Sequence, residues 1–447
     1  MIEMKKRLGA TAQLILVGLS LIVFLDGCAT PFRRPASVTR NNAFIVYWPA
    51  PKQSKQVRLA VKDSIDINGV VTTAGSQYLA KNSPPALHDA NCMAISRGRN
   101  VQIVGKTNLS EFAVSPSGLN EYFGTPKNRM SRRRRLIPGG SSSGSAVAVQ
   151  SGMADVAFGT DTAGSVRVPA ACCGIVGLKT TFGLVSLKGV FPIEPTHLDT
   201  VGPMARDVDH AMRGMDLLQN GFAKRYRTAV ANKASAKQIR IGRLYLSGTD
   251  PKVDKAVDDA LSKAHFKVSV LGQRFKAAWD QAKKDGDTLA AAGAFLNDRK
   301  FFGKFGVSAK TEAIIALGQF EYTTNYRNAL KRQAKWQYAL REVFKKVDFI
   351  ALPTLQALPP TISIFGDTAL SEAQMLSLQN TVAVNFAGNP ALAVPIPAND
   401  KKVPFSSLQL IGPRLSEAEL LNAGRLVEAG VNSSIHKTLF AKSAREP

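Results

Sequence analysis

The chain has 447 residues, of which 45% are hydrophobic and 20% are charged, as in an ordinary folded globular protein. This composition excludes a disordered or collagen-like chain, and four cysteines are too few for a scaffold held by disulfides. The formal net charge of +25 predicts attraction to anionic surfaces or polymers, but the sign alone does not choose among them.

The N-terminus has the pattern of an export signal. Basic residues at positions 5–7 precede an apolar run from Leu14 to Leu25, which is too short to span a bilayer. The run leads into Cys28, in a sequence similar to a bacterial lipoprotein cleavage box. We therefore predict a lipoprotein-type signal peptide over 1–27, lipidation of Cys28 and a Pro-interrupted tether over 28–40. Ordinary cleavage or an uncleaved anchor stays open, because Asp26 is atypical in such a box.

This pattern predicts localisation in the cell envelope, either membrane-anchored or periplasmic. The expected partners are the membrane, through the N-terminal lipid or anchor, and an anionic envelope surface, with no specific nucleic acid. Four consecutive arginines, Arg132 to Arg135, are interpreted as a solvated charge run, with an envelope-contacting patch or a substrate determinant as alternatives.

Strand-like and helix-like segments alternate over residues 41–447, which predicts a single large α/β domain. Cys92, Cys172 and Cys173 fit small core residues, because their spacing matches neither a metal site nor a disulfide framework. The expected strands are 57–63, 101–105, 349–353 and 391–395. The expected helices are a buried one over 146–150, several within 207–345, and one over 416–429.

Two Gly/Ser-rich segments carry the chemical signal. The first covers residues 138–145, and the second covers 159–170 and contains Thr162-Ala163-Gly164-Ser165. A serine nucleophile needs a base for its proton and backbone N–H donors for the developing oxyanion. Glycine lets the main chain turn tightly enough to present such donors. The second segment therefore supplies a nucleophile and its donors from consecutive residues.

The order of these motifs resembles the amidase-signature hydrolases. Lys62, within Ala60 to Asp66, is similar to the lysine segment of that family, and the two Gly/Ser segments are similar to its signature. The similarity continues through residues 174–179, 198–203, 352–354, 385–390 and 408–413. It implies an α/β amidase-signature fold, with a large mixed β-sheet covered by helices on both faces.

The resemblance also implies roles for particular residues. Lys62 would be the base, Ser141 the bridging serine in a cis peptide linkage, and Ser165 the nucleophile, 24 positions later. The amides of Thr162, Ala163, Gly164 and Ser165 would stabilise the oxyanion. The implied activity is cleavage of carboxamide C–N bonds in a small-molecule substrate through an acyl-serine, with no cofactor. Asp161 and Arg167 flank the nucleophile and are interpreted as a pair that supports the loop.

Several alternatives stay open at this stage. Ser142 fits G-x-S-x-G of α/β-hydrolases, but no later histidine lies in a convincing triad context. Ser434 to Lys437 matches S-x-x-K in the C-terminal tail, without accompanying loops. A catalytically silent, amidase-like envelope binding protein is a further alternative. So is an enzyme similar to the A subunit of the cytosolic glutamyl-tRNA(Gln) amidotransferase. No metal site is indicated, because no ligand motif is present.

Overall fold

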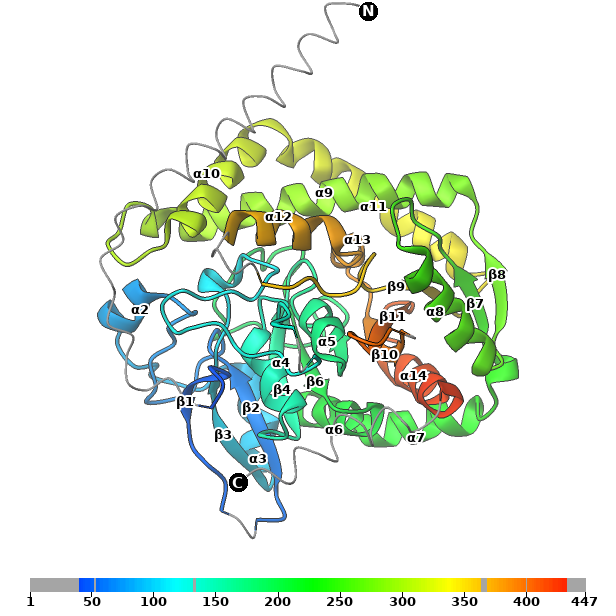
Figure 1. The fold of residues 1–447 in the computed structure, drawn as a ribbon, viewed down its shortest axis with the longest axis horizontal. Helices are drawn as coiled ribbons and strands as arrows, with labels where there is room; N and C mark the ends of the chain where they lie inside the picture. Colours follow the sequence, from blue (N-terminus) through cyan, green and yellow to red (C-terminus); the bar gives the residue numbers. More distant parts are fainter. Residues whose placement is uncertain (1–39, 52–53, 132–133, 363–367, 399, 432–447) are drawn as a thin grey trace, which may run out of the picture.

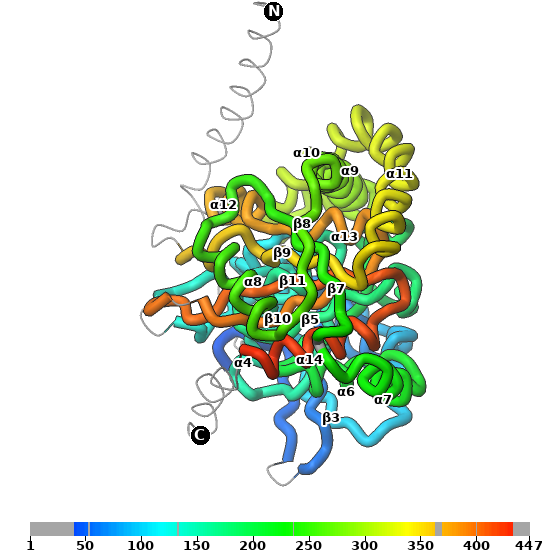
Figure 2. The backbone as a smooth tube through the Cα atoms, turned by 90° about the vertical axis from the view of Figure 1, so that its right-hand side faces the viewer, coloured from blue at the N-terminus to red at the C-terminus, as the bar shows by residue number. Residues whose placement is uncertain are grey.

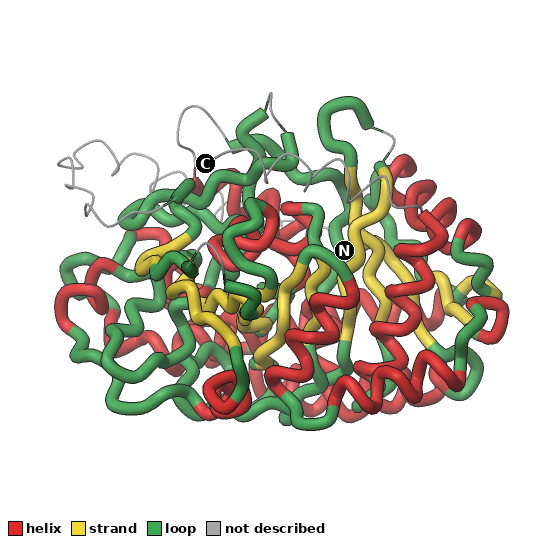
Figure 3. Tube along the Cα trace, turned by 90° about the horizontal axis from the view of Figure 1, so that it is seen from below, coloured by secondary structure: helices red, strands yellow, loops and turns green. Residues whose placement is uncertain are grey.

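The structure is a computed structural model of the chain, and it describes residues 40–51, 54–131, 134–362, 368–398 and 400–431. In this part of the chain, strands form one mixed sheet that continues across the width of the molecule (Figure 1 and Figure 3). Its order is β1-β3-β2-β4-β6-β5-β10-β11-β9-β7-β8, so the two ends of the sheet come from the first and the middle parts of the sequence. The predicted large mixed α/β fold is confirmed.

The described strands are β1 (Phe44–Tyr47), β2 (Val57–Lys62), β3 (Val101–Thr107), β4 (Val156–Asp161), β5 (Val176–Lys179), β6 (Thr200–Ala205), β7 (Arg240–Arg243), β8 (Lys267–Val270), β9 (Phe349–Pro353), β10 (Ala391–Pro397) and β11 (Phe405–Ile411). The described α-helices are α2 (Gln77–Asn82), α3 (Ala94–Gly98), α4 (Ser143–Gln150), α5 (Arg167–Cys173), α6 (Val208–Leu218), α7 (Phe222–Asn232), α8 (Pro251–Lys263), α9 (Gln273–Asp298), α10 (Ala309–Thr324), α11 (Tyr326–Phe344), α12 (Thr368–Leu378), α13 (Val382–Ala387) and α14 (Glu417–Val431).

The burial pattern of β10 explains why helices cover both faces of the sheet. Its alternate residues Leu392, Val394 and Ile396 pack into the core formed with α6, α8 and α14. Ala391 and Ala393 point to the opposite face, into the cores formed with α9, α13, α4 and α5. Successive side chains of a strand face opposite sides, so a strand buried on both faces is apolar throughout. Figure 2 shows α9, α10 and α11 stacked together on one side of the molecule.

The four predicted strands are confirmed in position, and so are the helices predicted over 146–150 and 416–429. The three predicted core cysteines are buried and free. The helices predicted within 207–345 are present as α6 to α11, but β7 and β8, which were not predicted, also lie there. All four residues of β8 are exposed at the sheet edge, so the segment lacks the apolar signal of a buried strand. In the described part of the chain, no helix combines the length and apolar character needed to cross a bilayer.

Candidate active site

Lys62 lies at the carboxyl end of β2, beside the end of the parallel strand β4. Its side chain is fully buried, and Nζ donates to Ser141 Oγ at 2.7 Å and to Thr160 Oγ1 at 2.7 Å. Strands β2 and β4 pair in parallel from Leu59 with Val156 onward, which brings both of their ends to one place. The crevice beyond the carboxyl ends of neighbouring parallel strands is a common position for a site in α/β proteins.

The buried position changes the protonation of Lys62. Burial lowers the pKa of Lys62 to about 7, while the nearby carboxylates of Asp161 and Asp199 act in the opposite direction. An amine in water holds its proton well above this value, because the ammonium ion is better solvated than the free base. Neutral amine is therefore available at physiological pH, which a proton-accepting role requires.

Ser141 sits on a loop whose backbone packs closely against a neighbouring loop. The Gly140–Ser141 peptide bond is cis, as predicted. A Cβ on Gly140 would lie 2.6 Å from the carbonyl oxygen of Ser115 and 2.6 Å from the amide nitrogen of Gly118. Only glycine fits this contact, so a larger residue at position 140 would displace the backbone next to Ser141. Helix α4 starts two residues after Ser141, which anchors the loop in the core.

Ser165 lies on the loop between β4 and α5 and is partly exposed, unlike Lys62 and Ser141. Its carbonyl accepts from the amide of Ser142 at 3.3 Å, so the two Gly/Ser loops are in direct contact. Among the described residues, none makes a hydrogen bond with the Ser165 hydroxyl, and the relay from Ser165 to Ser141 stays a prediction. The amides of Thr162 to Ser165 likewise donate to no acceptor within the described ranges.

The backbone of this loop is shaped by a glycine with an unusual conformation. Gly164 has φ +135°, and a Cβ there would lie 2.2 Å from Thr381 Oγ1. The Thr381 hydroxyl donates to the carbonyl of Ala163, which ties the loop to the residue before α13. An L-residue at position 164 would meet both backbone strain and a steric clash.

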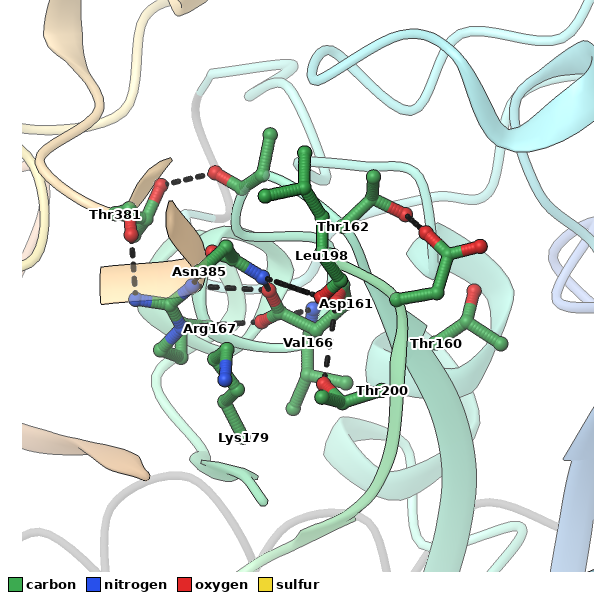
Figure 4. A network of polar contacts seen from close by, with 12 residues as sticks. Thr160, Asp161, Thr162, Val166, Arg167, Lys179, Leu198, Thr200, Thr381 and Asn385 are labelled. Carbon is green, nitrogen blue, oxygen red and sulfur yellow. Dashed lines mark hydrogen bonds and ion pairs between the residues drawn. The ribbon is translucent and has the colours of Figure 1, made fainter. Parts of the chain in front are cut away.

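Behind the loop, Asp161 and Arg167 form a fully buried ion pair (Figure 4). Arg167 Nε donates to Asp161 Oδ2 at 3.0 Å and Nη2 to Oδ1 at 2.9 Å. Arg167 also donates to the Thr381 carbonyl, Gln409 and Asn385, and Asn385 donates to Asp161 Oδ1 at 2.8 Å. Burial alone would raise the pKa of Asp161, but the guanidinium and its hydrogen bonds hold it at about 2. The pair joins the loop to α13 and β11.

We expect Arg167→Met to destabilise the protein by about 3–5 kcal/mol, because it leaves the Asp161 charge buried without its cation. The measurement is the free energy of unfolding from urea denaturation. The control is Lys255→Met, which removes an exposed helical pair with Asp259 and should change stability by less than about 0.5 kcal/mol. Equal effects of the two variants would contradict a supporting role for the buried pair.

Several sequence predictions fall outside the described residues. These are the signal peptide over 1–27, Cys28 and all but the last residue of the tether, the first half of the arginine run, and Ser434 to Lys437. Arg134 and Arg135 are described and exposed. Within the described ranges, no group of three His, Cys, Asp or Glu side chains is arranged to hold a metal ion.

Sequence reasoning assigned no role to four residues that hold the site together: Thr160, Asp199, Thr381 and Asn385. Asp199 accepts from Thr162 Oγ1 at 2.7 Å. Three of the four lie in segments that were noted for their family resemblance, but no local pattern indicates which distant loop each side chain contacts. Thr381 lies just outside those segments, and no motif in the sequence marks it as part of the site.

The sequence and the fold of the chain are similar to those of known amidases. A family profile described as Amidase matches residues 56–421, so the chain belongs to the amidase family. It is 33% identical over 408 residues to the A subunit of glutamyl-tRNA(Gln) amidotransferase from Halobacterium salinarum, covering 83% of this chain and 94% of that protein. The crystal structure of the corresponding subunit from Thermotoga maritima matches with a TM-score of 0.70 and 26% identity, over 87% of this chain and 89% of that one.

The fold is also shared with more distant members. A bacterial aryl acylamidase of the amidase-signature enzymes matches with a TM-score of 0.71 at 20% identity, over 88% of this chain and 85% of that chain. The chain is thus an amidase-family hydrolase built on the amidase-signature fold.

Proposed function

We propose that the protein is a serine amidohydrolase that cleaves carboxamide C–N bonds through an acyl-Ser165 intermediate. The observation that carries this proposal is the buried contact between Lys62 Nζ and Ser141 Oγ, beside the partly exposed Ser165. A neutral lysine in that position has a lone pair that can accept the Ser141 proton. The fold is continuous from β1 to β11, in keeping with one domain over 41–447.

In the proposed reaction, Ser165 Oγ attacks the carbonyl carbon of the amide and gives its proton to Ser141. The Ser141 proton passes to Lys62, which becomes an ammonium ion. As the C–N bond breaks, the same route returns a proton to the departing amine or ammonia. Water then attacks the acyl-serine and gives a proton to Lys62 through Ser141. As the acyl C–O bond breaks, the same route returns that proton to Ser165 Oγ, so the carboxylic acid is released and both Ser165 and neutral Lys62 are restored.

The four free amides of Thr162 to Ser165 support the proposed oxyanion site. Thr162 and Gly164 are buried, and Ala163 and Ser165 are partly exposed. Buried N–H groups are nearly always paired in folded proteins, so amides without an acceptor among the described residues are available to a ligand. Preorganised donors of this kind stabilise the charge that develops on the carbonyl oxygen.

The test is turnover of a panel of small, fatty and peptide amides by the purified chain, with a fluorophosphonate probe that reports the labelled serine. Release of ammonia or amine, with labelling of Ser165, supports the proposal. Binding of amides without turnover would instead favour the silent binding protein.

A second candidate is one component of a multi-subunit amidotransferase, favoured by the 33% identity to the A subunit of glutamyl-tRNA(Gln) amidotransferase over most of both chains. The chemistry at Ser165 would be the same, but glutamine would be the amide donor and partner subunits would be needed. Glutamine hydrolysis that appears only when partner subunits are added would favour this candidate. Hydrolysis of other carboxamides by the chain alone would favour the independent amidase.

We further propose that the protein is exported and anchored through lipid on Cys28, on the basis of the N-terminal sequence pattern. Cells expressing the tagged full chain should incorporate a palmitate analogue into it, and Cys28→Ala should abolish that incorporation. Cys92→Ala is the matched control, since Cys92 is buried in the fold. An unlabelled chain that fractionates with cytosolic proteins would contradict the proposal and strengthen the amidotransferase candidate.

A further inference from the structure

Asp199 is a buried carboxylate beside the nucleophile loop, with contacts on both of its oxygens. Oδ1 accepts from Thr162 Oγ1 at 2.7 Å, and Oδ2 accepts from the amides of Ile193 and Glu194 at 2.9 and 3.1 Å. Backbone amides can only donate, and the Thr162 hydroxyl donates the third hydrogen bond. None of the three contacts requires a proton on the carboxylate. Burial raises the pKa of Asp199, while these three hydrogen bonds and the charge of Lys62 act in the opposite direction and favour the ionised carboxylate.

The charge balance around Lys62 distinguishes Asp199 from Asp161. Both carboxylates lie close enough to Lys62 to favour its ammonium form. Asp161 is already neutralised by two hydrogen bonds from Arg167. Among the described residues, Asp199 forms no ion pair, and all three of its donors are neutral groups. Its negative charge is therefore the one left to balance a proton on Lys62.

We propose that Asp199 is a positioning residue with two effects: it fixes Thr162, the first residue of the proposed oxyanion loop, and it supplies the counter-charge for the protonated Lys62. This inference rests on the proposed function. It is the proton transfer from Ser165 that creates a full positive charge in a buried place, where an uncompensated ion is costly. One carboxylate thus serves both the charge on the lysine and the position of the oxyanion donors.

Other titratable groups also face Asp199, and they are unchanged in the Asp199 and Thr162 variants described below. Glu194 is hydrogen-bonded to His197 at 2.8 Å, and the buried Asp298, at the end of α9, lies within electrostatic range of Asp199. Burial raises the pKa of both carboxyl groups, as it raises that of Asp199. The charge of Lys62 acts in the opposite direction on Asp199, whereas His197 does so on Glu194 and Lys300 on Asp298.

Two substitutions separate the two effects. Asp199→Asn removes the charge but can keep every contact, because its Oδ1 can accept from both amides while Nδ2 donates to the Thr162 hydroxyl. Thr162→Val removes the hydrogen bond but leaves the charge. The measurement is the pH profile of kcat and kcat/KM for the best amide substrate, with the rate of fluorophosphonate labelling measured over the same pH range.

For Asp199→Asn we expect the midpoint of the rise in kcat/KM to move down by about 0.5–1 pH unit, and the plateau to fall about tenfold. For Thr162→Val we expect an unchanged midpoint and a loss of about 10–100-fold, mainly in kcat, with Thr162→Ser restoring activity. An Asp199→Asn profile with the wild-type midpoint would overturn the counter-charge, and a fully active Thr162→Val would overturn the loop effect.

The same measurements distinguish a failure of the proposed function from a failure of the role of Asp199 alone. A wild-type chain with neither turnover nor labelling of Ser165 means that the proposed function has failed. An active wild type with unaffected variants means that only the role of Asp199 has failed. If Asp199→Asn does not fold, as judged by circular dichroism, Asp199→Glu carries the charge test. It retains the carboxylate and should keep the wild-type midpoint even if displacement of the loop lowers its kcat.

Discussion

We expect Ser165→Ala to lose at least about 10⁴-fold in kcat for amide hydrolysis, because the variant has no nucleophile to form the acyl intermediate. Labelling by the fluorophosphonate probe should be lost as well. The thermal unfolding midpoint should stay close to that of the wild type, since the Ser165 hydroxyl makes no hydrogen bond within the described part of the chain. Activity measured with purified protein and a chromogenic anilide checks this result.

Two neighbouring serines provide the controls. Ser142→Ala tests the rival nucleophile of the G-x-S-x-G pattern, whose side chain is fully buried and reaches the Thr160 carbonyl at 3.4 Å. Ser143→Ala removes a buried hydroxyl that has no hydrogen-bond partner among the residues that the structure describes. Both variants should keep their label on Ser165. Labelling that survives in Ser165→Ala but disappears in Ser142→Ala would reverse the assignment.

The second large effect concerns Lys62 and pH. Burial lowers the pKa of Lys62 to about 7, so kcat/KM should rise with pH through about 7 and level off above it, as the lysine becomes a neutral base. Lys62→Ala should lose at least about 10³-fold and should lack this rise. The exposed Lys188→Ala is the matched control and should keep the wild-type profile. A Lys62→Ala variant with the wild-type rate and profile would remove Lys62 from the mechanism.

The same shift links stability to pH. The pKa of Lys62 is lower in the folded chain than in the unfolded chain, so the unfolded state binds more protons between about pH 7 and 10.5. Stability contributed by this group is therefore lowest below pH 7 and rises as the pH increases through that window. Lys62→Met has no titrating amine at this position and gains none of this stability. Its free energy of unfolding relative to wild type should therefore decrease by about 4 kcal/mol from pH 7 to 10. A constant difference in urea unfolding would mean that Lys62 is not desolvated.

The sequence alone determined the family resemblance, the main strands and the contact between two distant residues. Strands β9 and β10 were predictable because both of their faces are buried, which leaves apolar runs. Strands β2 and β3 begin partly exposed and keep only short apolar stretches between polar residues. Strand β8 was not, since its exposure at the sheet edge leaves no such run. Lys62 and Ser141 were expected to meet, and they lie 2.7 Å apart although 79 positions separate them.

The solvation and the charge of the site depend on the folded arrangement of the chain. Lys62 is completely buried and its hydrogen-bond partners Ser141 and Thr160 are distant in sequence, so neither its exposure nor its protonation can be read from adjacent residues. The contacts of Thr160 with Lys62 and of Asp199 with Thr162 join segments far apart in sequence, and a short polar side chain carries no local mark of its distant partner. Side-chain types are fixed by the sequence, whereas distances and dielectric surroundings arise only when the sheet and its covering helices close around them.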